Sequence, residues 1–483
     1  MAKPSKSERK AQLGQFLTPA TTAKFMASLF VSDKTDTLRL LDPGAGTGSL
    51  TRAFLDRCAS GDLAFHRIEV TTYEIDGLLH EDLNRVLAEY ERRLPLTYDV
   101  RGCDFVQDAV KLILATRGLW GGEPGYTHAI LNPPYRKIRG DSHYRHDLRR
   151  VGIETVNLYS AFLALTLELM VPGGQIVAII PRSFCNGPYY LPFRELLLQR
   201  AAIRQMHLFG SRDKAFKGDG VLQENVIVVL ERDGAQGDVV VSTSHDDTLH
   251  DLTAHSYSFE RIVSPRAAGL FIHIPTSPHV SNSDLCLTHS LIDLGIGVST
   301  GPVVDFRLKE HLREMPGEGA VPLLYPAHFT RGTLDWPKAG GKKPNAILRN
   351  AETERWLYPT GCYCVVRRFS SKEERRRVVP SVIEPCNFAG ATALGLENHL
   401  NVFHEDRHGL LREVAYGLSV YLQSTRVDDD FRSFSGHTQV NATDLKLMSY
   451  PSREELIALG KWRLAQEAPS QGMIDEALNR VCG

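Results

Sequence analysis

Short apolar runs alternate with amphipathic stretches along the first half of the chain. Runs at 38–41, 68–75, 127–131 and 175–180 have the length and continuity of buried β-strands. Between these runs, apolar residues recur every three or four positions, which predicts helices that pack by one face. The alternation continues to about residue 231, so it predicts an α/β domain built around a mostly parallel sheet.

We expect seven strands in this sheet. The last two, at 203–209 and 225–231, are joined by a loop rather than a helix, which favours an antiparallel ribbon at the sheet edge. The predicted fold is therefore a seven-stranded, mostly parallel Rossmann-like sheet with helices on both faces. Ligands of such sheets bind at the carboxyl ends of the strands.

The pattern changes after about residue 233. The stretch 236–285 is rich in Ser, Thr and His and predicts a connector of short strands. From 286 to 483, Gly and Pro recur between short apolar runs, which indicates an irregular α+β domain. We therefore expect one domain over 1–235, a connector over 236–285 and a second domain over 286–483.

Composition limits the class of protein. A chain of 483 residues is too long for a single core, and 42% hydrophobic with 23% charged residues is typical of a soluble globular protein. No apolar run reaches the length of a membrane span, and residues 1–10 lack the apolar segment of a secretion signal. We therefore expect a cytoplasmic protein with no membrane partner. The eight cysteines lack the spacing of metal ligands, so we expect reduced thiols and no metal site.

A glycine-rich turn follows the first strand. Its sequence, Asp42-Pro43-Gly44-Ala45-Gly46, lies between a strand and a helix, where backbone can approach a ligand closely. The spacing matches neither a dinucleotide fingerprint nor a phosphate-binding P-loop. An acidic residue before the glycines suits a cationic ligand, such as the amino group of a methionine moiety. Glu74, at the tip of the second strand, is placed to bind ribose hydroxyls.

Two further segments add candidate ligand contacts. Asp104 and Phe105 follow the strand at 97–101; the carboxylate could accept from an adenine amino group and the ring could supply an apolar face. Taken by itself, Asp104 is better explained as a solvated loop carboxylate. Thr18 and Pro19 precede a predicted helix at 20–30, where they suit the N-cap and the first helical position.

The sequence Asn132-Pro133-Pro134-Tyr135 ends the strand at 127–131. It places polar carbonyls and a flat ring at the rim of the sheet, which suits a planar substrate bearing an amino group. Such a nitrogen is a poor nucleophile because its lone pair is delocalised. Hydrogen bonds to the side-chain carbonyl of Asn132 and the backbone carbonyl of Pro133 would stabilise the charge that develops on it. The alternative is a strand followed by an ordinary Pro-Pro turn.

Basic residues cluster locally although the formal net charge is −1. A polyanion such as DNA is attracted by local clusters of positive charge rather than by the net charge of the chain. Three segments combine cations, amides and aromatics, at 136–150, 367–377 and 431–441. Those residue types are common in phosphate contacts and base readout, although solvated charged loops have the same composition. The candidate DNA contacts are Arg136, Lys137, Arg367, Arg368, Arg375, Arg376, His437, Gln439 and Asn441.

The ordered set of motifs resembles a known family over residues 12–231. Gly14-Gln15-Phe16 with Thr18-Pro19, then the glycine turn, Glu74, Asp104-Phe105 and Asn132-Pro133-Pro134-Tyr135, is similar to the gamma class of DNA amino-methyltransferases. These enzymes use S-adenosylmethionine, and the resemblance is to the adenine-N6 type of restriction-modification systems. Residues 286–483 would then be the target-recognition domain, to which the segment 436–445 is also similar.

The resemblance implies roles for individual residues and partners for the chain. Thr18 and Pro19 would line the methionine end of the cofactor, above Asp42, Gly44 and Gly46; Glu74 would bind its ribose; Asp104, Phe105 and Phe162 would enclose its adenine. Asn132, Pro133, Pro134 and Tyr135 would be catalytic, with Phe216 packing against the extruded base beside Tyr135. The implied partners are double-stranded DNA and a cognate restriction endonuclease, and we expect a monomer.

Three alternatives share part of this pattern. Cytosine-N4 methylation uses the same chemistry, although a serine in place of Asn132 would favour it more. Methylation of a protein glutamine uses the same motif, but the large second domain and Gly14-Gln15-Phe16 argue against it. A non-catalytic DNA-specificity subunit would tolerate loss of the catalytic residues, yet all four are present.

Overall fold

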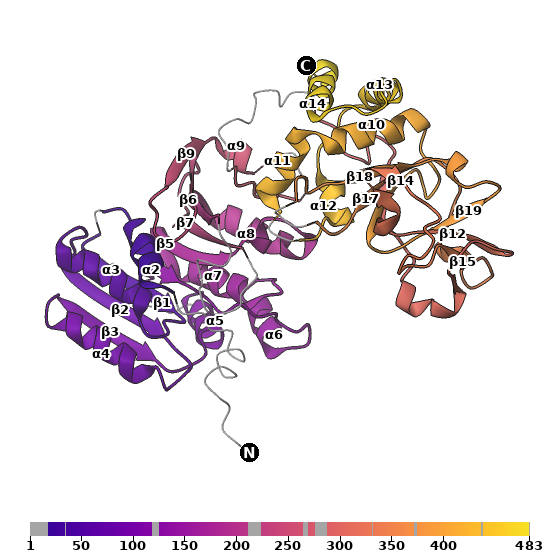
Figure 1. Ribbon diagram of the computed structural model, residues 1–483. Helices are drawn as coiled ribbons and strands as arrows, with labels where there is room; N and C mark the ends of the chain where they lie inside the picture. Colours follow the sequence, from indigo (N-terminus) through magenta and orange to yellow (C-terminus); the bar gives the residue numbers. More distant parts are fainter. Residues whose placement is uncertain are drawn as a thin grey trace. The chain divides into compact units, whose positions relative to one another are not determined.

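The computed structural model describes most of the chain, in two compact units (Figure 1). The described residues are 18–33, 35–117, 125–210, 224–263, 269–275, 287–330, 332–370, 374–435 and 438–482. Unit 1 comprises Met1–Pro265 with Leu270–Thr276, and unit 2 comprises Arg266–Gly269 with Ser277–Gly483. Each unit has its own core and is described separately.

Unit 1 is built on one nine-stranded sheet with the strand order β3-β2-β1-β4-β5-β7-β6-β8-β9. Strands β3, β2, β1, β4 and β5 are parallel, whereas β7 runs antiparallel to both β5 and β6. The strands are β1 (Thr37–Pro43), β2 (Arg67–Tyr73), β3 (Leu96–Arg101), β4 (Tyr126–Leu131), β5 (Met170–Pro181), β6 (Ala201–Phe209), β7 (Asn225–Arg232), β8 (Val239–Ser244) and β9 (Thr253–Tyr257).

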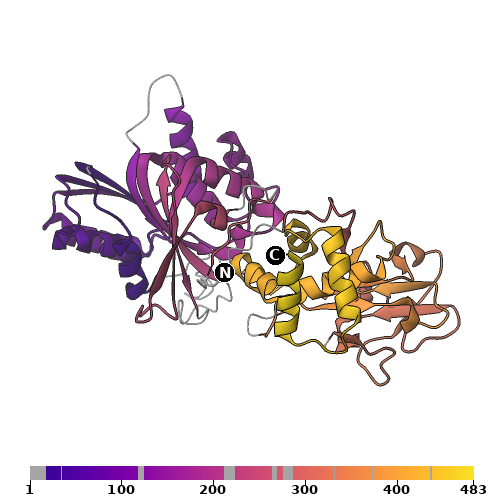
Figure 2. The ribbon, with the colours of Figure 1, turned by 90° about the horizontal axis from the view of Figure 1, so that it is seen from above.

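Helices cover both faces of this sheet, as Figures 1 and 2 show. Successive side chains of a strand point to opposite faces, so Leu40 joins the core beneath α2, α3 and α4 while Leu41 joins the core beneath α5, α7 and α8. The helices are α2 (Ala20–Ser28), α3 (Ser49–Ser60), α4 (His80–Glu91), α5 (Phe105–Thr116), α6 (His143–Arg150), α7 (Leu158–Leu169), α8 (Leu191–Arg200) and α9 (Phe259–Ile262).

The sheet has nine strands where seven were predicted, and part of the predicted connector belongs to it. Strand β8 pairs parallel to β6, and β9 pairs antiparallel to β8. Val239, Val241 and Tyr257 enter the same core as α5 and α7. These apolar side chains are buried on one face of the sheet, so the segment 239–257 extends the sheet. The antiparallel pair of β6 and β7 therefore lies in the interior of the sheet rather than at its edge.

Unit 2 combines small sheets with helices at its C-terminal end. Its sheets have the orders β10-β20-β17-β18, β11-β15-β12-β19-β16 and β13-β14. Its strands are β10 (Gly297–Thr300), β11 (Leu312–Arg313), β12 (Ala320–Leu324), β13 (Phe329–Thr330), β14 (Thr333–Leu334), β15 (Ala346–Leu348), β16 (Leu357–Pro359), β17 (Tyr363–Arg367), β18 (Pro380–Ile383), β19 (Ala393–Leu396) and β20 (Leu400–His404). The helices are α10 (Arg412–Gln423), α11 (Thr425–Phe434), α12 (Ala442–Leu447), α13 (Arg453–Leu464) and α14 (Gln471–Cys482).

Helices α10 and α13 pack with their backbones in close approach. A Cβ added to Gly417 would lie 1.9 Å from the carbonyl oxygen of Leu456, and one added to Gly460 would lie 1.8 Å from that of Glu413. Only glycine therefore fits at these two positions. Among the described helices of both units, none is long and apolar enough to cross a membrane.

Candidate active site

The glycine turn between β1 and α3 forms one wall of the site. Gly44, Gly46 and Gly48 have φ of 84°, 58° and 81°, a region that glycine adopts without steric cost. The amide of Gly44 donates to the carbonyl of Tyr73 at the end of β2, at 2.8 Å. A Cβ at Gly44 would lie 3.8 Å from the ring of Phe162. The turn therefore lies at the carboxyl ends of the strands, beside the N-terminal turn of α7.

Glu74, directly after β2, holds this turn in shape. Its carboxylate accepts from the backbone amide of Gly46 at 2.9 Å and from that of Asp76 at 2.7 Å. The ring of His80 is 2.7 Å from the Glu74 carbonyl oxygen. Burial raises the pKa of Glu74, and the two backbone hydrogen bonds oppose that rise. The predicted role in ribose binding stays a prediction; what the contacts establish is that Glu74 shapes the glycine turn.

Asp42 is a buried acid with one unused oxygen. Its Oδ2 accepts from the hydroxyl of Thr51 at 2.6 Å, and its Oδ1 has no hydrogen-bond partner among the described residues. Burial raises the pKa of Asp42 to about 7, which the hydroxyl of Thr51 opposes and the nearby charge of Glu74 adds to. A buried, unpartnered carboxylate oxygen beside a glycine turn fits a ligand cation such as an ammonium group.

The predicted adenine contacts lie together at the start of α5. The rings of Phe105 and Phe162 are buried with centroids 4.9 Å apart. Asp104 is the N-cap of α5, and its Oδ1 accepts from the amide of Gln107 at 3.1 Å. The hydroxyl of Tyr144 donates to its Oδ2. Both oxygens of Asp104 are thus engaged by the protein, and adenine binding by this carboxylate stays a prediction.

Asn132 follows β4 and is held between two hydroxyls. Its Nδ2 donates to Oγ1 of Thr18 at 3.0 Å, and its Oδ1 accepts from the hydroxyl of Tyr135 at 3.0 Å. The Tyr135 hydroxyl also lies 3.3 Å from the carbonyl oxygen of Ile179 on β5. Thr18 and Tyr135 thus hold both polar atoms of the Asn132 amide in place. Pro133 is buried beside it and Pro134 is half-buried.

The contact of Thr18 with Asn132 corrects one local prediction. Pro19, rather than Thr18, is the N-cap residue of α2, and α2 has no side-chain cap hydrogen bond. The Thr18 hydroxyl instead accepts a hydrogen bond from the side chain of Asn132. The Thr18 carbonyl accepts from the hydroxyl of Ser49 at 3.3 Å. Thr18 therefore joins the start of α3 to the Asn-Pro-Pro-Tyr motif.

A set of hydroxyls behind Tyr135 was not predicted from the sequence. The ring of Tyr135 lies 6.3 Å from that of Tyr159, whose hydroxyl is 2.9 Å from Oγ of Ser183. Ser183 also lies 3.2 Å from the hydroxyl of Tyr190, to which Asn157 donates at 2.5 Å. The available signal was the position of Ser183, immediately beyond β5 and therefore at the same sheet edge as Asn132.

The structure joins two of the segments predicted to contact DNA. In unit 2, Phe369 pairs with Gln439 in an antiparallel bridge. The amide of Ser370 donates to the carbonyl of Thr438 at 3.0 Å, and that of Val440 donates to the carbonyl of Arg368 at 2.7 Å. The segments 368–370 and 438–440 are therefore neighbouring strands.

Several predicted DNA contacts are used inside unit 2. Arg376 donates to Oγ1 of Thr425 at 2.8 Å and pairs with Asp428 at 3.5 Å, and Arg367 pairs with Glu374. Asn441 and Asp444 form the capping box of α12, in which Nδ2 of Asn441 donates to Asp444 at 3.0 Å. Exposed positions are Arg375 in unit 2 and Arg136 with Lys137 in unit 1. Phe216 and His437 lie outside the described residues.

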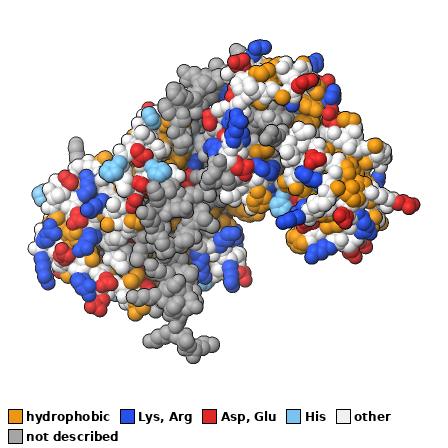
Figure 3. Space-filling view, viewed as in Figure 1, with side chains coloured by type: hydrophobic (Ala, Val, Ile, Leu, Met, Phe, Trp, Pro, Cys, Tyr) orange, Lys and Arg blue, Asp and Glu red, His pale blue; other side chains and the backbone are white. Residues whose placement is uncertain are grey.

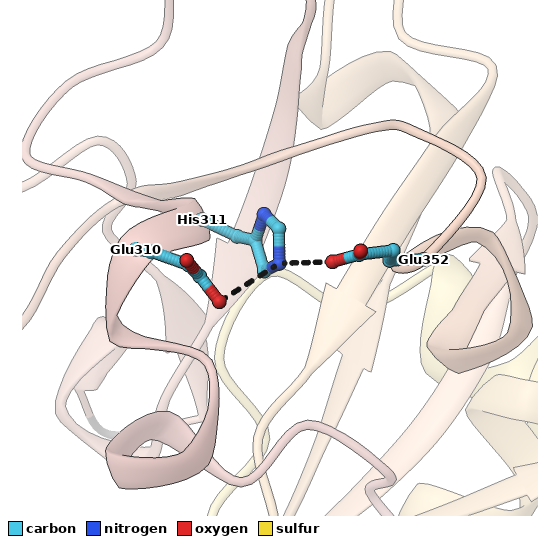
Figure 4. A group of neighbouring side chains, drawn as sticks. All are labelled: Glu310, His311 and Glu352. Atoms are coloured by element: carbon cyan, nitrogen blue, oxygen red, sulfur yellow. Dashed lines mark ion pairs between the residues drawn. The ribbon is translucent and has the colours of Figure 1, made fainter.

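One group of side chains in unit 2 has the composition of a metal site (Figure 4). Nε2 of His311 lies 3.1 Å from Glu352 and 3.8 Å from Glu310. Both carboxylates are largely exposed, at 73% and 80% of the side chain. Solvated carboxylates beside one histidine are explained by ion pairing alone, so the group carries no metal assignment.

Unit 1 thus brings three features to one edge of its sheet: the glycine turn after β1, the buried acid after β2 and Asn-Pro-Pro-Tyr after β4. That arrangement is typical of an S-adenosylmethionine-dependent methyltransferase. The unpartnered oxygen of Asp42 fits the cationic end of this cofactor.

Comparisons with known proteins identify the family. A family model described as "Eco57I restriction-modification methylase" matches residues 81–216. The chain is 50% identical over 480 residues to Type II methyltransferase M.BsuBI of Bacillus subtilis, covering 98% of this chain and 95% of that protein. It is 41% identical over 458 residues to Type II methyltransferase M.PstI of Providencia stuartii, covering 92% and 88%. This chain therefore belongs to the Type II DNA methyltransferases of restriction-modification systems, which confirms the resemblance found in the sequence.

A solved structure also shares the fold. The Type IIL restriction-modification enzyme MmeI in complex with DNA aligns with a TM-score of 0.53 and 10% identity, covering 98% of this chain and 71% of that chain. At this identity the likeness shows the fold alone.

Proposed function

We propose that this DNA methyltransferase methylates the N6 amino group of adenine in double-stranded DNA, as the modification enzyme of a restriction-modification system. The observation that carries the proposal is the Asn132 amide, held at the rim of the sheet by Thr18 and Tyr135. The Asn132 and Pro133 carbonyls are the two acceptors that an amino group with two hydrogens requires. S-adenosylmethionine, when bound, supplies the electrophilic methyl group.

The two carbonyls promote transfer by stabilising the charge that develops on the amino nitrogen. Preorganised dipoles of this kind contribute about 10²–10³-fold each in rate. A covalent intermediate on the protein is unnecessary, because the amino nitrogen itself can attack. Cys185, near the site, is fully buried, and burial raises the pKa of its thiol to about 12. It is therefore a neutral thiol and a poor nucleophile at physiological pH.

We assign the cofactor to the edge formed by the turn after β1. Gly44 and Gly46 allow the ligand to approach the backbone, and the free oxygen of Asp42 supports an ionic contact with the ammonium group. The remaining proposed contacts are Thr18 and Pro19 at the methionine end, Glu74 at the ribose, and Asp104, Phe105 and Phe162 at the adenine. The buried Phe105–Phe162 pair supplies an apolar surface for the last of these.

The target adenine must leave the duplex to reach Asn132. Tyr135 is half-buried at the rim, where its ring can stack on an extruded base, and Phe216 is the proposed second ring. Stacking on an aromatic side chain stabilises a base by about 1–3 kcal/mol, which offsets part of the cost of unstacking.

We propose that unit 2 is the target-recognition domain, with the paired segments 368–370 and 438–440 on its DNA-facing side. Arg368, Arg375 and Gln439 suit phosphate or base contacts, because each is at least partly exposed. Arg367, Arg376 and Asn441 act instead by holding these segments in place through their internal contacts. Figure 3 shows Lys and Arg side chains mixed with Asp and Glu over the face viewed. Binding of DNA phosphates would therefore depend on individual exposed cations rather than on the net charge of the chain.

The biological setting follows from this chemistry. We propose that the protein acts as a monomer in the cytoplasm, where host DNA lies, and that a cognate restriction endonuclease cleaves the same sequence when it is unmethylated. Each recognition site is then protected by the methyl group that this enzyme adds.

The direct test is methyl transfer from labelled S-adenosylmethionine to duplex DNA, with the product nucleoside identified by mass spectrometry. We expect N6-methyladenine. N4-methylcytosine would contradict the proposed base, and label in protein but not in DNA would contradict the proposed substrate.

A further inference from the structure

We propose that Tyr189 contacts the DNA duplex beside the extruded base, stacking on the bases that extrusion leaves exposed. The inference rests on the proposed base-flipping function of the Asn132 site. Tyr189 is the most exposed aromatic ring among the large apolar side chains of the described residues, at 75%. It lies in the turn Pro188–Tyr190, between β5 and α8.

The turn lies at the rim of the catalytic site. Three tyrosine rings connect the motif to the turn: the centroid of Tyr135 is 6.3 Å from that of Tyr159, which is 6.0 Å from that of Tyr190. Tyr159 is buried, Tyr190 is half-buried, and Tyr189, its neighbour in the turn, is exposed. A duplex that delivers a base to Asn132 has to approach this rim.

Arg136 and Lys137 lie near the same turn, because their backbone pairs with that of Asn157 and Leu158. Lys137 forms an antiparallel bridge with Asn157, and the amide of Leu158 donates to the carbonyl of Arg136 at 2.8 Å. Asn157 in turn donates to the hydroxyl of Tyr190 at 2.5 Å. Arg136 and Lys137 are both exposed. Exposed cations beside an exposed ring match a partner with phosphates outside and bases inside.

A buried arginine fixes the turn that carries Tyr189. Arg194 is fully buried, and its guanidinium donates to the carbonyls of Phe184, Asn186 and Gly187 at 2.9, 3.0 and 3.0 Å. Gly187 has φ of 79°, which directs the chain into the turn. The backbone that leads into the turn is therefore held by a buried guanidinium, which favours a fixed position for the exposed ring of Tyr189.

Extrusion of one base removes its stacking on two neighbours and leaves a gap. A planar ring that fills the gap stabilises the flipped state without touching the reacting atoms. Tyr189 is thus a DNA-contacting residue and not a catalytic one. Its contribution depends on the ring rather than the hydroxyl, so phenylalanine should replace it and alanine should not.

The test compares Tyr189→Ala and Tyr189→Phe in the full-length enzyme. On a fully paired duplex, we expect Tyr189→Ala to lower kcat/KM about 5- to 160-fold, the range for one lost stacking contact. The fluorescence of 2-aminopurine at the target position should fall in parallel. Tyr189→Phe should retain both, and cofactor affinity should be unchanged in both variants.

A mismatched partner opposite the target base separates this role from a structural one. A mismatch lowers the cost of extrusion, so it should restore most of the activity of Tyr189→Ala. An equal defect on paired and mismatched duplexes, or no defect on the paired duplex, would overturn the proposal. If the wild-type enzyme were found to methylate cytosine, the proposed base would fail, yet the same comparison of duplexes would still test Tyr189.

Discussion

The sheet edge of unit 1 and the basic segments of unit 2 differ in what their predicted residues do. In unit 1, Asp42, Glu74 and Asn132 come from three different strands and lie together, buried and hydrogen-bonded. In unit 2, Arg367 and Arg376 lie within one basic segment, yet both are committed to internal ion pairs. The position of residues at the ends of strands therefore predicts which residues lie together better than a cluster of charge predicts which cations are left unpaired.

The largest expected effect is at the sheet edge. Asn132→Ala removes one of the two carbonyls that we propose accept from the amino group, so we expect kcat to fall about 10²–10³-fold. Cofactor affinity should change less than kcat, because the proposed role of the Asn132 carbonyl is towards the substrate, although its Nδ2 also bonds Thr18. Thr166→Val is a matched control, since Thr166 is a buried hydroxyl that has no hydrogen-bond partner among the described residues. Equal losses of cofactor binding and turnover in Asn132→Ala would contradict the assigned role.

The ionisation of Asp42 should make cofactor binding depend on pH. The carboxyl has a pKa of about 7 because it is buried, whereas the cationic end of the cofactor prefers the ionised form. Affinity should therefore fall towards tenfold per pH unit below about pH 7, and it should fall again above about pH 8, where the α-amino group of the cofactor loses its proton. Asp42→Asn should bind more weakly and lose this dependence. Calorimetric titration between pH 6 and 8 checks it, and a flat wild-type profile would exclude the ionic contact.

A buried histidine gives unit 1 a pH-dependent stability. Burial lowers the pKa of His207 to about 4 from the ordinary 6.5. The unfolded chain therefore binds a proton between those values that the folded chain does not, so the contribution to stability is lost as pH falls from about 6.5 to 4. Relative to His207→Gln, the wild type should lose about 1.4 kcal/mol per pH unit in that range. An equal change in unfolding free energy between pH 7 and pH 5 for the wild type and His207→Gln would disprove this.

The smallest expected effects are on stability and DNA affinity, when two neighbouring arginines of unit 2 are replaced in turn. Arg376→Ala removes contacts with Thr425 and Asp428, so we expect a loss of about 1–2 kcal/mol in unfolding free energy. Arg375→Ala removes an exposed cation and should leave stability within about 0.5 kcal/mol, while weakening DNA binding and reducing its salt dependence. Thermal unfolding and DNA titration of both variants test this. A loss of stability in Arg375→Ala, with a loss of DNA affinity alone in Arg376→Ala, would contradict the roles given to these two arginines.

The sequence predicted which residues of unit 1 lie together, because they stand at the ends of strands whose order is constrained. Apolar runs located β1, β2 and β4, and the parallel topology placed Asp42, Glu74 and Asn132 at one edge. Thr18 was assigned to a helix cap, since nothing local reveals that its hydroxyl reaches Asn132 across 114 positions of sequence. Strands β8 and β9 were missed as part of the sheet because an edge strand with Ser, Thr and His resembles a loop in composition.

Unit 2 was predictable only as an α+β region. The pairing of Phe369 with Gln439 joins segments about 70 residues apart, and local patterns carry no information on such register. The same limit applies to the turn with Tyr189, whose rigidity depends on the buried side chain of Arg194.

The most direct test of the central claim is sequencing of genomic DNA from two otherwise identical hosts without other DNA methyltransferases. One host expresses the wild-type chain and the other expresses Asn132→Ala at equal abundance. We predict N6-methyladenine at one recurrent sequence in the first host and its near absence in the second. Methylated cytosine in the first host, or equal adenine methylation in both, would contradict the account.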